Sequence, residues 1–243
     1  MIKEYYYDLH IHSCLSPCGD DDMTPNNIAG MGKITGLDIM ALTDHNSCKN
    51  CPAFFEAAQK YGIIPVPGME LTTAEDIHIV CLFDCLEAAM KFDEDVDRRR
   101  VLIKNRTDIF GNQFIMNGND EITGEDENML PNATSISLDE VVTFVEEHGG
   151  VCYPAHIDRE ANGIIATLGT FPDFPEFRCA ELHDRAKQSE YRDKYPRLKN
   201  MPLIFSSDAH YLEHIGEREN SMMLSGETPD EIRKALIEKI RNP

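Results

Sequence analysis

Histidine and carboxylate side chains recur in short clusters along this 243-residue chain. In chain order the clusters are Asp8-Leu9-His10-Ile11-His12, Thr43-Asp44-His45, Gly68-Met69-Glu70, the isolated His78, Pro154-Ala155-His156 and Ser207-Asp208-Ala209-His210. Imidazole and carboxylate groups are ligands suited to zinc, iron and manganese. If the fold brings these side chains together, the chemistry they support is that of bound metal ions.

The clusters lie at or near short apolar runs that are typical of β-strands. We expect seven strands, at residues 5–12, 38–42, 63–66, 77–83, 151–154, 179–182 and 202–205. In parallel α/β folds the carboxyl ends of the strands form the edge where active sites are built. Six of the nine histidines fall at these strand-associated positions. A single metal site needs three or four protein ligands, so the larger number of candidates predicts a cluster of ions.

Helical patterns separate several of these strands. One helix is expected to begin at Thr24-Pro25, and another to cover residues 52–61 and end at Gly62. Ser137 with Glu140, and Thr228 with Glu231, each have the spacing of a capping box. Alternation of strands and helices predicts a parallel sheet covered by helices, one strand short of an eight-stranded barrel.

Residues 87–131 interrupt this alternation. The segment is rich in Asp, Glu, Asn and Gly, and it contains the basic run Arg98-Arg99-Arg100. We interpret residues 1–243 as one domain carrying an insertion at about 87–131. Long irregular segments in compact domains are often functional, so the insertion is expected to act as a lid or as a partner surface.

The overall charge is strongly acidic, with 23 Lys and Arg against 43 Asp and Glu, giving a formal net charge of −20. This balance disfavours general nucleic-acid binding and anionic membrane surfaces. It does not exclude an anionic small molecule, because bound cations can reverse the sign of a pocket. The N-terminal residues lack an export signal, so the eight cysteines are read as thiols and the expected location is the cytoplasm.

Taken in order, the motifs DLHIHS, TDHN, GME, PAH and SDAH resemble those of the PHP (polymerase and histidinol phosphatase) superfamily. The resemblance extends over nearly the whole chain. It implies an α/β fold, a distorted seven-stranded (βα)7 TIM-like barrel, which agrees with the strand count. It also implies two or three divalent metal ions, which we expect to be zinc, manganese or iron, and usually phosphoesterase activity.

The resemblance assigns metal ligands residue by residue. The first ion would be held by His10, His12, Glu70 and Asp208, the second with help from His45 and His210, and the third by Glu70, His78 and His156. A further ligand is expected shortly after His12, where the sequence offers Cys18 or Asp20. Spacing favours Cys18 slightly, and a thiolate there would favour zinc or iron over manganese.

Four other residues are candidates for catalytic roles. Asp44 is expected to orient a ligand without touching the metal. Arg159 and Arg185 could hold phosphate oxygens, although a surface salt bridge is an equally good interpretation of each. His183 is the candidate general acid for the leaving group.

Together these residues predict a metal-dependent hydrolase of phosphate esters. Metal ions a few ångströms apart lower the pKa of a water between them and stabilise an in-line displacement. The expected substrate is a small phosphorylated molecule, either a phosphomonoester or a small phosphodiester. The alternatives are amidohydrolase-like hydrolysis of a non-phosphate bond and a metal-binding regulatory module without turnover.

Overall fold

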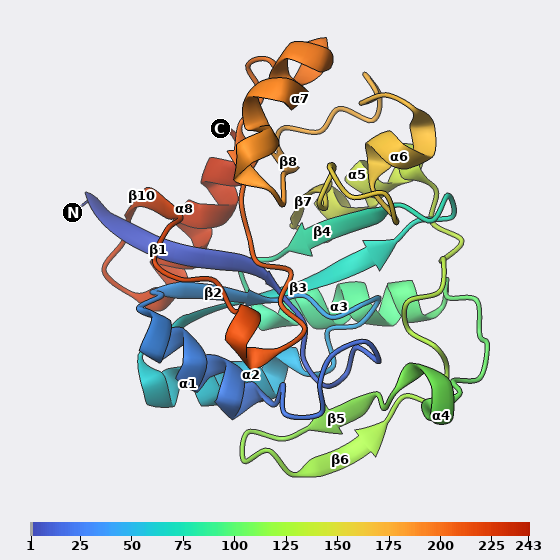
Figure 1. The fold of residues 1–243 in the computed structure, drawn as a ribbon. Coiled ribbons are helices and arrows are strands. Elements are labelled where there is room, and N and C mark those ends of the chain that lie inside the picture. The colour runs from blue at the N-terminus through green and yellow to red at the C-terminus, as the bar shows by residue number, and fades with distance from the viewer. Residues whose placement is uncertain (1) are drawn as a thin grey trace.

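A mixed six-stranded sheet forms the centre of the computed structural model, which describes residues 2–243 (Figure 1). Its strand order is β10-β1-β2-β3-β4-β7. The strands are β1 (Ile2–Ile11), β2 (Ile39–Leu42), β3 (Ile64–Thr72), β4 (His78–Leu82), β7 (Val151–Pro154) and β10 (Ser221–Ser225). Two further strands, β8 (Ala180–Glu181) and β9 (Leu203–Ile204), pair with each other in parallel.

All seven predicted strands are present, but the distorted seven-stranded (βα)7 barrel is not confirmed: six strands form one curled sheet, and β8 and β9 pair separately. β1, β2 and β3 are parallel, whereas β4 pairs antiparallel with both β3 and β7. Two strands run against this group: β10, which pairs antiparallel with β1 at the edge of the sheet, and β4, whose reversal has a local cause. The cause is the five-residue connection 73–77, because a parallel crossover needs a dozen or more residues. The result is a curled sheet in which β8 and β9 form a separate pair.

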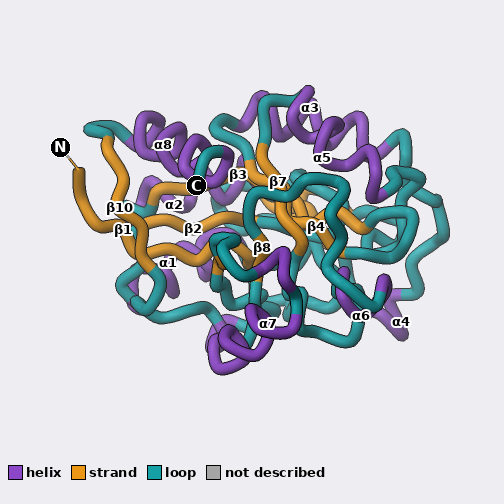
Figure 2. The backbone as a smooth tube through the Cα atoms, turned by 90° about the horizontal axis from the view of Figure 1, so that it is seen from above, coloured by secondary structure: helices purple, strands orange, loops and turns teal. Residues whose placement is uncertain are grey.

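Helices cover the sheet, so its inner strands β2, β3 and β4 are buried on both faces. They are α1 (Pro25–Thr35), α2 (Cys51–Tyr61), α3 (Leu86–Asp97), α5 (Leu138–Glu147) and α8 (Pro229–Arg241). Figure 2 shows α3, α5 and α8 along one side of the strands and α1 on the other. In β2, Ile39 and Ala41 pack in one apolar cluster, and Met40 and Leu42 pack in another. This division follows the two-residue period of a strand.

Most of the predicted helix ends are confirmed. Thr24 caps α1 by accepting from the Asn27 amide, Gly62 ends α2 in a left-handed conformation, and Thr228 with Glu231 forms the capping box of α8. The capping box predicted at Ser137 is wrong. The Ser137 hydroxyl donates to the Glu140 carboxylate, and the first amide of α5 donates to Glu75 instead.

The segment expected as an insertion is partly packed into the domain. Phe92 and Val96 of α3 are fully buried. Beyond α3 come the single turn α4 (Thr107–Phe110) and a hairpin of β5 (Phe114–Met116) and β6 (Ile122–Glu125). The Gly111 backbone lies so close to the Pro17 carbonyl that a Cβ there would be 2.3 Å from its oxygen. The division into one domain with an insertion stays a prediction.

Short helical turns complete the chain. They are α6 (Ile164–Leu168), η1 (Arg185–Lys187), α7 (Gln188–Lys194), η2 (Pro196–Leu198) and η3 (Leu212–His214). Within residues 2–243, none of the helices has both the length and the apolar character that crossing a membrane requires.

A buried ion-pair cluster fixes the end of the hairpin to the domain. The Asp126 carboxylate lies 2.7 Å from Lys49 Nζ, and its two oxygens lie 2.9 and 3.1 Å from the Arg100 guanidinium. Burial alone would raise the pKa of Asp126, but Arg100 and Lys49 outweigh this effect and lower the pKa to about 2.

We expect Asp126→Asn to lower the free energy of unfolding at pH 7 by roughly 2 kcal/mol, as measured by urea denaturation. The folded-state pKa is below the ordinary value of 3.8, so the stabilisation is complete above about pH 4 and is lost as the pH falls towards 2. The difference between wild type and variant should therefore shrink below pH 4. Asp108→Asn, which breaks the exposed pair with Arg106, is the control and should change little. Equal losses in the two variants would contradict the prediction.

Candidate metal centre

Side chains from five parts of the chain converge at one end of the sheet. Their ligand atoms form three overlapping groups, and within each group all atoms lie within 4.8 Å of one another. The groups are His10, His12, Glu70 and Asp208; His12, His45 and His210; and His45, Glu70 and His78. His156 joins them, with its Nε2 3.0 Å from Glu70 Oε1. The eight His, Glu and Asp residues expected as ligands are thus brought together.

The fold explains why these residues meet. His10 and His12 alternate with Ile11 at the carboxyl end of β1, so both side chains point to the same side. Glu70 lies in the last part of β3, and His45 forms a parallel bridge with it. His78 is the first residue of β4. Because β4 is reversed, its first residue lies at the edge where the other strands end.

Backbone strain is concentrated at the same edge. Asn46, His156 and Asp208 have φ angles of 46°, 28° and 51°, in the left-handed region that non-glycine residues rarely adopt. The Asn46 side chain holds its turn by donating to the Leu130 and Asn132 carbonyls. Strained residues of this kind are typical of functional sites, where the surrounding structure maintains them.

Glu70 is the hub of the cluster. Its Oε1 lies 3.2 Å from His10 Nε2 and 3.0 Å from His78 Nδ1, in addition to its contact with His156. Its Oε2 lies 3.3 Å from His12 Nε2 and 2.9 Å from His45 Nδ1. A carboxylate with an oxygen on each side of the cluster has the geometry needed to bridge two ions.

Buried charges give these groups unusual proton affinities. Burial alone would lower the pKa of His12 and of His45. The carboxylates of Asp208 and Glu70 raise the pKa of His12 to about 9, and the Cys18 thiol with Glu70 does the same for His45. Conversely, histidines hold the pKa of Glu70 far below its usual range despite its burial. The carboxylates therefore favour positive charge at the cluster.

The arrangement also fits metal ions. His45 Nδ1, His78 Nδ1, Glu70 Oε2 and Asp208 Oδ1 are buried polar atoms without a hydrogen-bond partner. His45 Nδ1 and Glu70 Oε2 lie 2.9 Å apart yet form no hydrogen bond, because they are not aligned for one. Ligands about 2.1 Å from a shared tetrahedral ion are separated by roughly 3.4 Å, close to the spacings in this cluster. The donor set of imidazoles and carboxylates suits zinc, iron or manganese.

Of the two candidates that follow His12, Cys18 is the better placed. Its sulfur lies close enough to the His45 ring for charge there to raise the pKa of His45, although Cys18 lies outside the three groups above. The Asp20 side chain instead accepts from the Asp22 amide, and its own backbone amide donates to the His210 carbonyl. A ligand role for Cys18 or for Asp20 stays a prediction.

Asp44 is buried behind the cluster. It accepts hydrogen bonds from the Ser13 amide, the Ser13 hydroxyl and the Ser16 hydroxyl, each at 2.7 Å. The Ser16 hydroxyl in turn contacts His12 Nδ1 at 2.9 Å. Asp44 therefore reaches His12 through Ser16, and it does not contact its sequence neighbour His45.

Arg159 and His183 lie together at the mouth of the cluster. The Arg159 guanidinium donates to the Asp208 carboxylate and lies 3.4 Å from the His183 ring. Arg185 lies elsewhere: it is exposed, it donates to the Asn220 side chain, and it stacks on the Phe205 ring at 4.0 Å. The structure brings two of these three candidates to the site and holds the third away from it.

Glu181 is a residue that the sequence patterns missed. It lies on β8, is fully buried, and contacts His10 Nδ1 with both oxygens, at 3.0 and 3.1 Å. No spacing rule marks it, because the motif around it contains only the less conspicuous His183. Its position at the end of the predicted strand 179–182 was the available signal.

A family model for the PHP domain matches residues 8–161. The chain belongs to the PHP family. The resemblance inferred from the motifs is thus confirmed. The PolC-type DNA polymerase III of Thermotoga maritima is 28% identical to this PHP chain over 178 residues, covering 62% of the chain and 13% of the polymerase.

Solved structures share the fold of this PHP chain at low sequence identity. PfuEndoQ, a lesion-specific endonuclease from Pyrococcus furiosus, has a TM-score of 0.70 at 19% identity, covering 97% of this chain and 56% of the endonuclease. A protein from Bifidobacterium adolescentis described as a metal-dependent phosphoesterase has a TM-score of 0.60 at 18% identity, with 95% of both chains covered. The chain thus spans about half of the endonuclease and a small part of the polymerase.

The expectation of a small phosphorylated substrate, with no role for nucleic acid, is contradicted by these comparisons. Another structure of Endonuclease Q contains a 27-mer duplex with an abasic lesion at its active site, and the curated relative is a DNA polymerase. The expectation rested on a net charge of −20, which sums over the whole surface. Local charge decides binding, and bound divalent ions reverse it in an acidic pocket.

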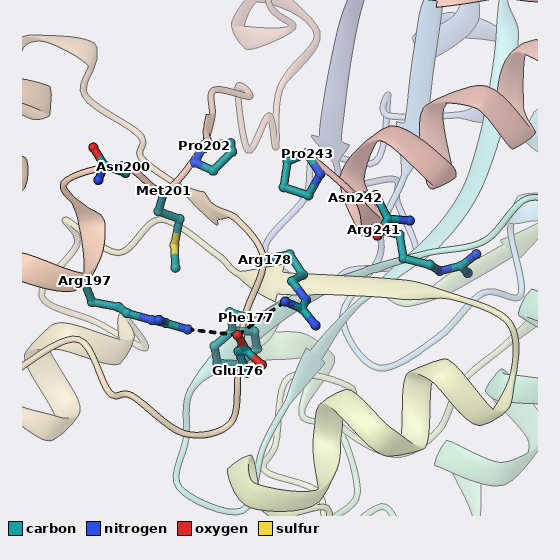
Figure 3. A pocket seen from close by; sticks show the side chains of 10 residues that line it. All are labelled: Glu176, Phe177, Arg178, Arg197, Asn200, Met201, Pro202, Arg241, Asn242 and Pro243. Atoms are coloured by element: carbon teal, nitrogen blue, oxygen red, sulfur yellow. Dashed lines mark hydrogen bonds and ion pairs between the residues drawn. The ribbon is translucent and has the colours of Figure 1, made fainter.

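A separate hollow lies at the other end of β8 and β9, outside the metal centre. Its volume is about 550 Å³, and Arg178, Arg197 and Arg241 line it. Figure 3 shows that the Arg178 and Arg197 guanidinium groups both approach Glu176, at 3.3 and 3.6 Å. None of the candidate metal ligands lines this hollow. Its arginines can therefore serve as controls for Arg159 at the metal centre.

We expect Glu70→Gln to lower bound metal by at least one ion per chain, as measured by elemental analysis of protein reconstituted with zinc or manganese. The amide cannot supply the negative charge or the two oxygen donors of a bridging carboxylate. The matched control is Glu75→Gln, because Glu75 caps α5 and does not touch the cluster. If Glu70→Gln retained the wild-type metal content, the hub role of Glu70 would be wrong.

Proposed function

We propose that this chain is a metal-dependent phosphoesterase that cleaves phosphodiester bonds in nucleic acid. The observation that carries the proposal is the convergence of six histidines, Glu70 and Asp208 on one buried edge, with Arg159 at its mouth. PHP membership and the shared fold of Endonuclease Q support it. The site combines imidazoles, a potential bridging carboxylate and an adjacent guanidinium, which suit hydrolysis of an anionic ester.

The proposed division of labour follows from the contacts. When bound, divalent ions would lower the pKa of a water and stabilise charge that develops on the phosphate. His10, His12, Glu70 and Asp208 would hold one ion. His45 and His210 would hold a second with His12, and Glu70 would bridge to a third near His78 and His156. We propose two or three ions, and Cys18 as a further ligand beside His45.

Arg159 is proposed to hold a phosphate oxygen. The Arg159 side chain is 39% exposed and lies between the buried Asp208 and the solvent, where an incoming anion would meet it. Arginine suits this role because its planar donors match two phosphate oxygens at once. Arg185 is not part of this proposal, since its guanidinium is already placed on Phe205 and Asn220.

His183 is proposed to protonate the leaving oxygen. Burial and the neighbouring Arg159 charge lower the pKa of His183, so the free chain holds it neutral at pH 7. A bound phosphate would offset the guanidinium charge and favour the protonated ring. His183 would then become protonated, and so able to act as an acid, only when substrate is bound.

We expect metal-dependent cleavage of a fluorescently labelled oligonucleotide, tested as a single strand, an intact duplex and a duplex with an abasic site. Chelation with EDTA should abolish cleavage, and manganese or zinc should restore it. Asp208→Asn should remain inactive after metal is added, because the ligand is lost. If wild-type protein with its full metal content cleaved none of the three probes, the proposal would be wrong.

Arg159→Ala should lower kcat/KM by roughly 10- to 100-fold, because the substitution removes one charged hydrogen-bond donor to the phosphate. The metal content should stay unchanged. Arg178→Ala is the matched control. Arg178 lies in the separate hollow of Figure 3, so its loss should leave kcat/KM within about twofold of wild type. Equal effects of the two substitutions would show that Arg159 acts through overall charge and not through a contact.

A further inference from the structure

We propose that Glu181 is a positioning residue for two histidines of the metal centre at once, His10 and His156. The inference rests on the proposed metal-dependent function and concerns the affinity for metal. It follows from the burial of Glu181, its hydrogen bonds and the lack of any other cation to balance it.

Glu181 fixes the ring of His10. An ionised carboxylate accepts hydrogen bonds and cannot donate them, so the proton between Glu181 and His10 belongs to His10 Nδ1. This leaves His10 Nε2 directed at Glu70 Oε1 and Asp208 Oδ1, which lie 3.2 and 3.4 Å away. A carboxylate behind a metal-binding imidazole selects the tautomer and raises the basicity of the ligand nitrogen.

The same carboxylate holds the backbone of His156. Its Oε1 accepts the His156 amide at 3.0 Å, and the Glu181 carbonyl accepts the next amide, that of Ile157, at 2.9 Å. His156 is the residue with φ of 28°, a conformation that needs support from its surroundings. Glu181 provides that support and thereby directs His156 Nε2 towards Glu70 Oε1.

The charge of Glu181 is the second part of the inference. The residue is 0% exposed, and no lysine or arginine within residues 2–243 forms a salt bridge with it. Its one ion-pair partner there is His10, itself a proposed ligand, and a buried carboxylate is costly unless a positive charge balances it. A metal ion bound to the opposite ring nitrogen of His10 would place a positive charge near Glu181. Binding of the ion and the negative charge of Glu181 should therefore stabilise each other.

Two substitutions separate geometry from charge. Glu181→Gln can keep one acceptor oxygen, at the position of Oε1, which serves both His10 and the His156 amide. Glu181→Ala removes the acceptor altogether. We expect zinc affinity, measured by competition with a chromophoric chelator, to fall about tenfold in Glu181→Gln and by up to about 100-fold in Glu181→Ala.

Asp93→Asn is the matched control. Asp93 is also buried, and it accepts from the Ser47 hydroxyl and the Cys48 amide, but it does not touch the cluster. It should cost stability without changing zinc affinity. Circular dichroism of each variant establishes that the chain is folded before the affinities are compared.

A spectroscopic measurement on wild-type protein tests the same idea without any variant. Long-range ¹H–¹⁵N correlation of the zinc-loaded chain should show His10 protonated at Nδ1. The inference is overturned if His10 is the other tautomer, or if folded Glu181→Gln and Glu181→Ala bind zinc as tightly as Asp93→Asn does. Neither readout involves substrate, so failure to cleave oligonucleotides would overturn the proposed function and leave this inference standing.

Discussion

The attraction between the Glu70 carboxylate and five imidazoles is the interaction on which the rest of the site depends. Among residues 2–243, Glu70 is the one side chain that contacts all of His10, His12, His45, His78 and His156. Burying so many ionisable groups is unfavourable unless opposite charges compensate each other. In the proposed active state, bound metal ions would supply that compensation. The strained turns at Asn46, His156 and Asp208 are consistent with a backbone arranged around this one carboxylate.

Much of the site could be predicted from sequence because metal ligands are few in kind and strands end at a common edge. The resemblance to the PHP superfamily grouped His10, His12, Glu70 and Asp208, and the structure brings them together. Helix ends marked by Pro, Gly and Thr were predictable for a similar reason, since local hydrogen bonding determines them. The exception at Ser137 shows the limit. The Ser137 side chain caps no amide, and Glu75, from a distant part of the chain, accepts the Leu138 amide instead.

What escaped prediction depends on contacts between distant segments. The reversal of β4 was implicit in the short connection 73–77, but the alternation of strands and helices suggested an all-parallel sheet. Glu181 belongs to no sequence motif, because its role depends on a contact with His10 that forms only when the fold places β8 beside β1. Arg185 has the residue type expected of a phosphate ligand, yet Phe205 and Asn220 hold it elsewhere. The substrate was misjudged because net charge is a property of the whole surface, whereas the site has its own local charge.

The reversed β4 also has a consequence for the order in which the chain can assemble. His45, Glu70 and His78 lie within 34 residues of one another and meet through a hairpin, so closing that part of the centre costs little loop entropy. Asp208 and His210 are about 130 residues further along. Because contacts close in sequence form faster than distant ones, one half of the centre can exist on the ribosome well before the other half has been synthesised. A partial ligand set of this kind could capture an ion early, and the late-arriving strands would then close over it.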